Sequence, residues 1–224
     1  PVLINKKAVE GLAYPEYERG EGYKVDDQYL VGTAEHAIVP MHMEETFDAK
    51  DLPRRYAAFS TAFRREAGSY GKDTRGIFRV HQFDKVEMVS FVDKKDEDKE
   101  HEFLLSIEEK IVKELGLPYQ VIKMCTGDLG FPASRKFDIE TWIPTQNKYR
   151  ETHSVSTTGD FQARRLNIKV KKGDQSEFVC ILNGTAVAIG RMLIVLMENY
   201  QVKDGSVMVP KVLQKYTGFN KIPA

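Results

Sequence analysis

Residues 61–87 read TAFRREAGSYGKDTRGIFRVHQFDKVE and carry more information than any other part of the chain. The segment combines an Arg-x-Glu pair (Arg64 and Glu66), a glycine-rich basic loop at 68–76 and a strand-like run at 77–83, and it ends in the carboxylate of Glu87. Arginine binds phosphate through two parallel hydrogen bonds, and an aromatic side chain can stack on a nucleobase. The segment therefore predicts a β-hairpin that holds a nucleoside triphosphate, with its loop reaching outward.

The composition is that of an ordinary globular protein. The chain has 224 residues, of which 42% are hydrophobic and 29% charged, so one large α/β or α+β domain is expected. The net charge is zero, which excludes a global field that would draw the chain to nucleic acid or an anionic membrane. Charge is uneven, however, because residues 54–85 hold eight Lys or Arg and only three Asp or Glu. Arginines that alternate there with apolar residues favour a phosphate-facing sheet over a solvated surface.

The two cysteines and the hydropathy pattern indicate a cytoplasmic protein. Cys125 and Cys180 lie in apolar surroundings and form neither a disulfide framework nor a CxxC metal site. No stretch approaches the roughly 18 apolar residues that a membrane span needs, and no signal peptide is visible. We therefore expect a reducing compartment and no membrane.

The apolar pattern outside the hairpin predicts many strands and few helices. Thr33 is expected to cap a short helix, because a Thr side chain can accept a hydrogen bond from a free backbone N–H. The expected strands are 29–32, 55–66, 76–92, 119–124, 137–143, 149–155 and 177–183, and the expected arm is irregular over 1–28. The longer helices are expected at 186–200 and after the mixed-charge run 93–102, which is predicted to be a loop that enters a helix continuing to Leu115. Because these strands follow one another without regular helical crossovers, an α+β fold with an antiparallel sheet is favoured over a Rossmann-type sheet. No GxGxxG or P-loop is present, so nucleotide binding would depend on the hairpin.

Several strings together resemble the seryl-tRNA synthetase family. Residues 61–87 resemble motif 2 of a class II aminoacyl-tRNA synthetase, and LNGTAVAIGRMLIVLMENY at 182–200 resembles motif 3. The spacings of 21 residues from Glu66 to Glu87 and of 64 residues from Glu87 to Glu151 are those expected of a seryl enzyme, and DFQARRLNIK at 160–169 is also similar to that family. The resemblance covers about residues 29–218. It implies an antiparallel class II sheet flanked by helices, in a single catalytic domain over residues 1–224 with motif 2 at about 56–87 and motif 3 at about 177–200.

The resemblance assigns an ATP site. It implies that Arg64 bridges the α-phosphate and the substrate carboxylate, that Glu66 accepts from the adenine amino group along the same strand face, and that Arg191 reaches the γ-phosphate. The remaining implied ATP contacts are Val80, His81, Gln82, Phe83, Glu151 and Ser154, with Phe83 under the adenine and Glu151 and Ser154 beside Mg²⁺. Apart from the resemblance, Arg64 with Glu66 would be a surface ion pair, Phe83 a core residue, His81 a structural histidine and Arg191 part of an internal ion pair.

The resemblance also assigns a serine pocket. Thr33-Ala34-Glu35 matches the motif that meets the substrate ammonium group, and Arg64 would hold the carboxylate. Glu87, Asn183 and Thr185 match the positions that line the pocket for the serine hydroxyl. Such a pocket rejects alanine, because alanine would leave its polar groups without partners. The alternative for Glu87 is a charge on an edge strand.

The partners implied are L-serine, ATP, Mg²⁺ and the acceptor end of tRNA(Ser), with Lys72 and Arg75 in the motif 2 loop contacting tRNA phosphates. A homodimer is implied for the full-length protein. Pro1 resembles the tail of motif 1, so the motif 1 helix and the tRNA-binding arm are expected upstream of this chain. Three alternatives remain: an amino acid:carrier-protein ligase, whose pocket would hold zinc with cysteines; a catalytically silent binding module; and a core that binds ATP and serine without turnover.

Overall fold

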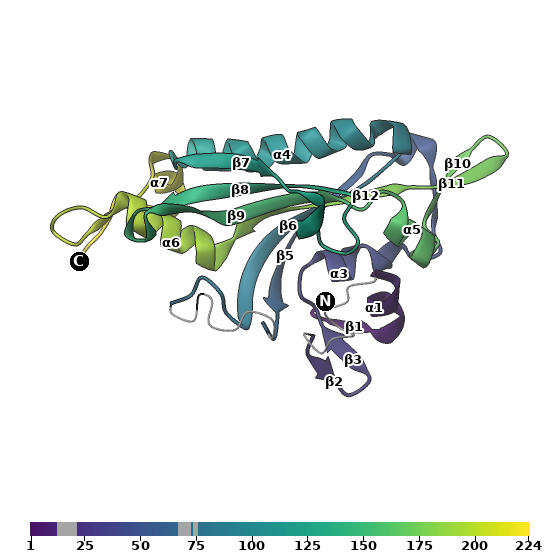
Figure 1. Cartoon of the computed structure of the whole chain (residues 1–224), viewed down its shortest axis with the longest axis horizontal. Helices are drawn as coiled ribbons and strands as arrows, with labels where there is room; N and C mark the ends of the chain where they lie inside the picture. The colour runs from purple at the N-terminus through teal and green to yellow at the C-terminus, as the bar shows by residue number, and fades with distance from the viewer. Residues whose placement is uncertain (13–21, 67–72, 74–75) are drawn as a thin grey trace.

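Strand pairing around one large sheet organises the molecule. The computed structural model describes residues 1–12, 22–66, 73 and 76–224. Six strands pair in the spatial order β5-β6-β12-β9-β8-β7, and every neighbouring pair is antiparallel (Figure 1). Their bounds are β5 Arg54–Phe63, β6 Gln82–Val92, β7 Tyr119–Lys123, β8 Arg135–Ile143, β9 Lys148–Thr157 and β12 Cys180–Ala188. The expected α+β fold with an antiparallel sheet is confirmed.

Shorter elements surround this sheet. The helices are α1 Lys6–Leu12, α3 Glu35–Ile38, α4 Glu97–Glu114, α5 Phe161–Leu166, α6 Ile189–Tyr200 and α7 Lys211–Thr217. The small sheets comprise β1 Leu3–Asn5 with β3 Gln28–Leu30 and β2 Lys24–Val25, β11 Gln175–Phe178 with β10 Lys169–Lys172 and β4 Thr46–Asp48, and β13 Val207–Met208 with β14 Lys221–Ile222. The β10–β11 hairpin projects from one end of the molecule, and α7 lies at the other (Figure 1).

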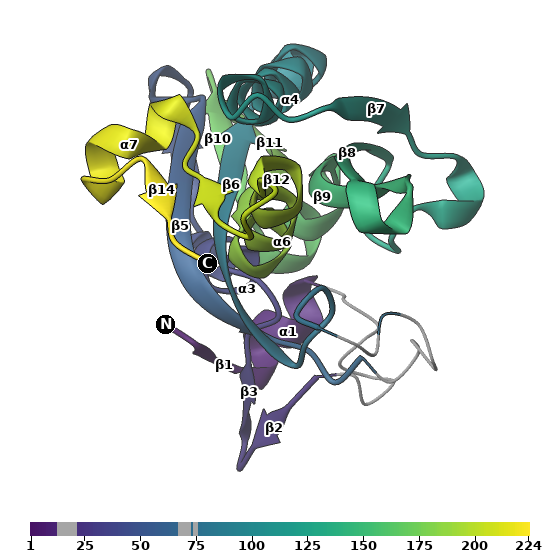
Figure 2. The same cartoon turned by 90° about the vertical axis from the view of Figure 1, so that its left-hand side faces the viewer.

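The two faces of the sheet have different covers. Alternate residues of β12, such as Leu182, pack with Leu104 of α4 and Val155 of β9 in one core cluster. The residues between them face the other way, where Ile181 packs with Leu12 of α1 and Leu166 of α5 in a second cluster. Helix α4 therefore covers one face, and α1 and α3 lie on the other (Figure 2), where Figure 1 also shows α5. The part of that second face which these helices leave open forms the candidate site.

The N-terminal segment is more regular than expected. Residues 1–28 were predicted to form an irregular arm, and this is wrong for residues 3–12, which form β1 and α1. Ile4, Ala8 and Val9 are buried against Val31 in a small core cluster. The short helix is stabilised by this tertiary contact, which a propensity argument on so few residues does not detect.

Several element boundaries also differ from expectation, and the predicted strand 177–183 spans the end of β11 and part of β12. Strand β5 ends at Phe63 and β6 begins at Gln82, so residues 76–81 form turns in place of a strand. The alternating apolar pattern there arises because Phe78 packs into the cluster that contains α6 residues such as Met192 and Val195. Strand β12 continues to Ala188 through a bulge between Thr185 and Val187, so α6 begins later than predicted. Helix α4 is confirmed, with Gly116 at φ +66 directly after its C-cap.

Within the described part of the chain, no helix has the length and apolar character that a membrane crossing requires.

Candidate active site

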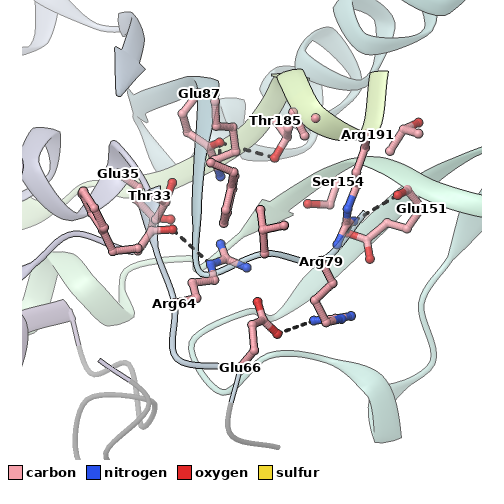
Figure 3. A pocket seen from close by; sticks show the side chains of 18 of the residues that line it. Thr33, Glu35, Arg64, Glu66, Arg79, Glu87, Glu151, Ser154, Thr185 and Arg191 are labelled. Atoms are coloured by element: carbon pink, nitrogen blue, oxygen red, sulfur yellow. Dashed lines mark hydrogen bonds and ion pairs between the residues drawn. The ribbon is translucent and has the colours of Figure 1, made fainter. Parts of the chain in front are cut away.

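A cavity of about 450 Å³ lies against the open part of the sheet (Figure 3). Of the residues predicted to form the site, the cavity is lined by Thr33, Glu35, Arg64, Glu66, Val80, Phe83, Glu87, Glu151, Ser154, Asn183, Thr185 and Arg191. These residues come from α3, the β5–β6 hairpin, β9, β12 and the first turn of α6. The fold thus brings together segments that are far apart in the sequence.

Three predicted residues do not line the cavity. Ala34 is 3% exposed and belongs to the core cluster beneath α3. The ring of His81 lies 3.0 Å from the hydroxyl of Tyr23 and 3.0 Å from the carbonyl oxygen of Arg64, and Gln82 is exposed at the start of β6. Lys72 and Arg75, the predicted tRNA contacts, lie outside the described residues.

Arg64 stands at the mouth of the cavity, directly after β5. Its Nε donates to the carbonyl oxygen of Gly32 over 3.1 Å, and its guanidinium carbon lies 5.4 Å from the centre of the Phe83 ring. The Gly32 bond uses one of five donors. This hydrogen bond fixes the orientation of the Arg64 guanidinium group, whose other donors remain on the cavity side (Figure 3).

Glu66 reaches the cavity by a different route from the one predicted. Strand alternation was expected to place it on the same face as Arg64, and this is wrong, because the strand has already ended. Glu66 has a positive φ of 54°, and its Oε2 accepts from Arg79 over 2.6 Å. A left-handed turn and an ion pair therefore position this carboxylate.

Arg191 lies deep in the cavity, in the first turn of α6. Its Nη1 donates to the carbonyl oxygen of Glu151 over 3.0 Å and lies 3.6 Å from that residue's carboxylate, and its Nε donates to the Phe78 carbonyl oxygen over 3.3 Å. Burial lowers the pKa of Arg191, the carboxylate of Glu151 opposes this, and the positive charges of Arg64 and Arg79 lower the pKa further. Three guanidinium groups around one cavity favour an occupant with several negative charges.

The wall of the cavity that β6 and β12 form carries a buried polar pair. Thr185 of β12 pairs directly with Glu87 of β6, and its hydroxyl donates to the Glu87 carboxylate over 3.3 Å. Lys85, on the same face of β6, forms an ion pair with Glu87. Strand β6 has neighbours on both sides and Glu87 is 2% exposed. The alternative of an edge-strand charge is therefore excluded.

The start of α3 and the residues just before it supply a carboxylate and a hydroxyl. Thr33 was expected to cap the helix, and this is wrong, because Ala34 occupies the N-cap position without a side-chain cap. The buried Thr33 hydroxyl has no hydrogen-bond partner within the described residues, so it is available to a ligand in the cavity. Oε1 of Glu35 accepts from the side-chain amide of Gln162 over 2.9 Å. Burial, together with Arg64 and Lys85, holds the pKa of the neighbouring His36 well below its usual range.

Sequence reasoning missed three cationic residues that line the cavity: Arg79, Lys85 and Lys136. Lys85 could have been found, because residues two apart on a strand share a face and Glu87 had already been singled out. Arg79 lies in turns, and Lys136 reaches the cavity from β8, where it pairs with Asp138 over 2.9 Å. No local pattern marks either of these two as a cavity residue.

A buried carboxyl group lies behind the pocket, on the α4 side of the sheet. Glu108 of α4 is 0% exposed, and neither of its oxygens has a hydrogen-bond partner in the described part of the chain. One of these oxygens would lie 2.8 Å from a Cβ placed on Gly184, the residue between Asn183 and Thr185. Burial, and next the negative charge of Glu87, raise the pKa of Glu108 well above its usual value. We therefore expect it to be neutral in the folded protein.

Glu108→Gln should raise stability at pH 8 and leave it nearly unchanged at pH 4. The raised pKa means that the unfolded chain loses the proton first, so the wild-type residue costs stability once the pH exceeds its unfolded value. Urea unfolding midpoints at the two pH values measure this difference. Glu109→Gln is the matched control and should lower stability at pH 8. A 2.6 Å hydrogen bond from Tyr119 lowers the pKa of Glu109, so its ionised form stabilises the folded protein. Equal shifts of the Glu108 variant at both pH values would contradict a neutral Glu108.

Comparison with known proteins points to one family. Residues 21–200 match the family described as tRNA synthetase class II core domain (G, H, P, S and T). Among curated proteins, serine--tRNA ligase 1 of Streptomyces avermitilis is 50% identical over 220 residues, which cover 97% of this chain and 52% of that protein. The chain spans about half the length of the curated relatives it matches.

Two solved structures are similar over the whole chain. Seryl-tRNA synthetase from Pyrococcus horikoshii complexed with ATP superimposes with a TM-score of 0.95 at 44% identity, covering 100% of this chain and 51% of that one. Cytoplasmic serine-tRNA ligase from Naegleria fowleri in complex with AMP superimposes with a TM-score of 0.93 at 39% identity, covering 100% of this chain and 54% of that one. The expected resemblance is confirmed at the level of sequence and fold.

Proposed function

The chain belongs to the family of tRNA synthetase class II core domains, and from this we propose that it joins L-serine to ATP as seryl-adenylate, for transfer to tRNA(Ser) by the whole protein. The observation that carries the proposal is the cavity itself. Among the described residues it is lined by the guanidinium groups of Arg64, Arg79 and Arg191 and by a buried Glu87–Thr185 pair. The relatives with the highest identities given above are serine--tRNA ligases, which supports serine as the amino acid.

We assign the ATP phosphates to the part of the cavity that the arginine side chains line. Arg64 would bind the α-phosphate and the serine carboxylate, and Arg191 the γ-phosphate. Phe83, which already lies 5.4 Å from the Arg64 guanidinium, would stack on the adenine, and Glu66 would accept from the adenine amino group. Arg79 binds Glu66 here and would turn to the phosphates when they enter.

We assign serine to the part of the cavity between α3 and the Glu87–Thr185 pair. Thr33 and Glu35 would meet the ammonium group, and Glu87 and Thr185 the side-chain hydroxyl, with Asn183 beside them on the same face of β12. Glu87 is an acceptor held by Lys85, so the serine hydroxyl can donate to it. Gly184 behind this wall is in contact with Glu108, so the wall is closely packed from its back.

Activation needs positioning and charge stabilisation more than proton transfer. A serine carboxylate oxygen would bond to the α-phosphorus while the bond to pyrophosphate breaks, and no proton moves in this step. Negative charge grows on the phosphate oxygens, where the guanidinium groups of Arg64 and Arg191 can stabilise it. His81 is not required as a base, which agrees with its position outside the cavity lining.

The donor set suits a magnesium ion that arrives with ATP. Within the described residues no group of three or more His, Cys, Asp or Glu could hold a metal ion. The Glu151 carboxylate is 42% exposed in the cavity and Ser154 lines the same wall, which fits an ion held chiefly by phosphates and water. Glu151 and Ser154 would help to hold the ion, which would supply positive charge against the charge of the departing pyrophosphate.

Excess EDTA should therefore abolish the exchange activity, and Glu151→Gln should raise the Mg²⁺ concentration needed for half-maximal rate. A Mg²⁺ titration of the exchange rate at fixed ATP measures both effects. Glu140→Gln is the matched control, because Glu140 pairs with Glu151 across β8 and β9 but lies outside the cavity lining. An unchanged Mg²⁺ requirement in the Glu151 variant would remove that residue from the metal site.

The remaining proposals concern the whole protein, because this chain spans about half the length of its curated relatives. We propose that Lys72 and Arg75 contact tRNA phosphates, that the full-length protein is a homodimer, and that it works in the cytoplasm. Support for a dimer comes from β5, a ten-residue strand at the edge of the main sheet with Phe59 66% exposed on it. A long exposed edge of this kind is usually covered by another chain or element.

Serine-dependent ATP–pyrophosphate exchange tests the proposed function, with alanine, glycine and threonine as competitors. Serine-selective exchange would establish activation by this core. A well-folded sample that exchanges with no amino acid would instead favour a silent module or a core without turnover. Neither cysteine is among the described residues that line the cavity, so the zinc-dependent carrier-protein ligase gains no support.

A further inference from the structure

The motif DFQARRLNIK at 160–169 has a side chain that faces the candidate site, and it is neither of the two arginines. Arg164 pairs outward with Asp160 over 2.6 Å, and Arg165 donates to the backbone carbonyl oxygen of Glu10 over 2.6 Å. Gln162, between them and the end of β9, is 0% exposed. Its side chain points in the opposite direction, toward Glu35.

Gln162 binds Glu35 in one orientation only. Its Nε2 donates to Oε1 of Glu35 over 2.9 Å, across 127 residues of sequence. On its other side, the Thr158 hydroxyl lies 3.3 Å from Oε1 of Gln162 and 3.0 Å from the carbonyl oxygen of Ile181, and shares its proton between them. A flipped amide would set its oxygen against the carboxylate of Glu35, where neither group could donate. The carboxylate of Glu35 therefore fixes the amide orientation, and the Thr158 hydroxyl is compatible with it.

This contact matters because Glu35 is in a buried position. Glu35 is 2% exposed, yet it lines the cavity beside the unpartnered hydroxyl of Thr33. A buried carboxylate without fixed donors would be costly and would adopt several rotamers. Gln162 fixes one oxygen of Glu35 from behind, so the carboxylate presents a constant edge to the cavity.

We propose that Gln162 is a positioning residue for substrate ammonium recognition, acting through its hydrogen bond to Glu35. The inference rests on the proposed function, in which Glu35 meets the ammonium group of serine. It adds a specific role for the α5 motif: the Thr158–Gln162–Glu35 series of contacts connects the main sheet, at Ile181, to the amino-acid end of the cavity. Gln162 itself does not line the cavity, so its effect is indirect.

The test uses Gln162→Met, which keeps the volume and removes the donor, and Gln162→Glu, which sets a second carboxyl against Glu35. Arg164→Met is the matched control on the same helix, because its ion pair faces outward. Loss of a hydrogen bond to a charged group should raise the serine KM by about tenfold in the Met variant and more in the Glu variant. The KM for ATP should be unchanged in both Gln162 variants, and the control variant should keep the wild-type KM for serine.

A second measurement separates positioning from a merely structural role. Calorimetry would measure the dissociation constants of two compounds. One is an adenosine sulfamoyl ester that carries a seryl group, and the other is the same compound without its α-amino group. The wild type should prefer the amino compound, and Gln162→Met should lose most of that preference while binding the desamino compound as the wild type does. Equal losses for both compounds, or an unchanged serine KM, would overturn the inference. A wild type that binds neither compound would overturn the proposed function itself, and the inference with it.

Discussion

Arg64→Ala is expected to abolish serine-dependent ATP–pyrophosphate exchange, with a loss of at least about 10³-fold, while the protein stays folded. Removing one preorganised donor from a developing charge costs about 10² to 10³-fold in known enzymes, and Arg64 would contact both reacting groups. Arg64 is exposed at the cavity mouth, so among the described residues its removal takes away the 3.1 Å hydrogen bond to Gly32 and the contact with the Phe83 ring, and it creates no buried cavity. The exchange rate and the thermal midpoint together measure the two halves of this expectation.

Arg54→Ala is the control for Arg64. Arg54 is the first residue of β5, the strand that Arg64 follows; it pairs with Glu45 over 3.3 Å and does not line the cavity. Its loss should leave the exchange rate close to that of the wild type, since an ion pair with both partners so exposed contributes little. An Arg64→Ala protein that exchanges at the wild-type rate would refute the α-phosphate assignment. Equal loss in both variants would indicate that strand β5, and not the guanidinium, is what matters.

Thr185→Ala and Glu87→Ala are expected to lower the preference for serine over alanine by at least about 10²-fold. A site that binds a substrate hydroxyl rejects the analogue without it by about 10⁴ to 10⁵-fold, because its own polar groups would be left without partners. Each substitution removes one member of the pair that the structure joins over 3.3 Å. The ratio of kcat/KM for serine and alanine in the exchange assay measures the change.

The two variants should differ in stability. Thr185→Ala removes a neutral group, whereas Glu87→Ala leaves the buried Lys85 without its partner, which typically costs about 3–5 kcal/mol. Thr185→Ala is therefore the cleaner test of selectivity. Thr61→Ala serves as the control, because that β5 hydroxyl binds Asp84 over 2.7 Å and does not line the cavity. Unchanged selectivity in Thr185→Ala would place the hydroxyl pocket elsewhere.

Much of the site could be predicted because its residues lie in strings whose spacing is fixed by local structure. Arg64, Glu87 and Arg191 were predicted because the strings that hold them resemble family motifs, and all three line one cavity. Helix α4 was predicted to end at about its observed position, since its apolar side and the glycine after it are both local signals. Alternation misled in the turns at 76–81, because Phe78 is buried there by a helix more than a hundred residues later in the chain.

The sequence alone determined the family resemblance, the antiparallel character of the sheet and the identity of most cavity residues. Only the tertiary structure decided that Glu66 arrives through a left-handed turn, that Glu108 is buried with no hydrogen-bond partner among the described residues, and that Gln162 binds Glu35 across 127 residues. The physical reason is that periodicity and motif spacing report contacts within a few residues. Which side chains meet across the fold depends on the order and register of the strands, and no local pattern encodes these.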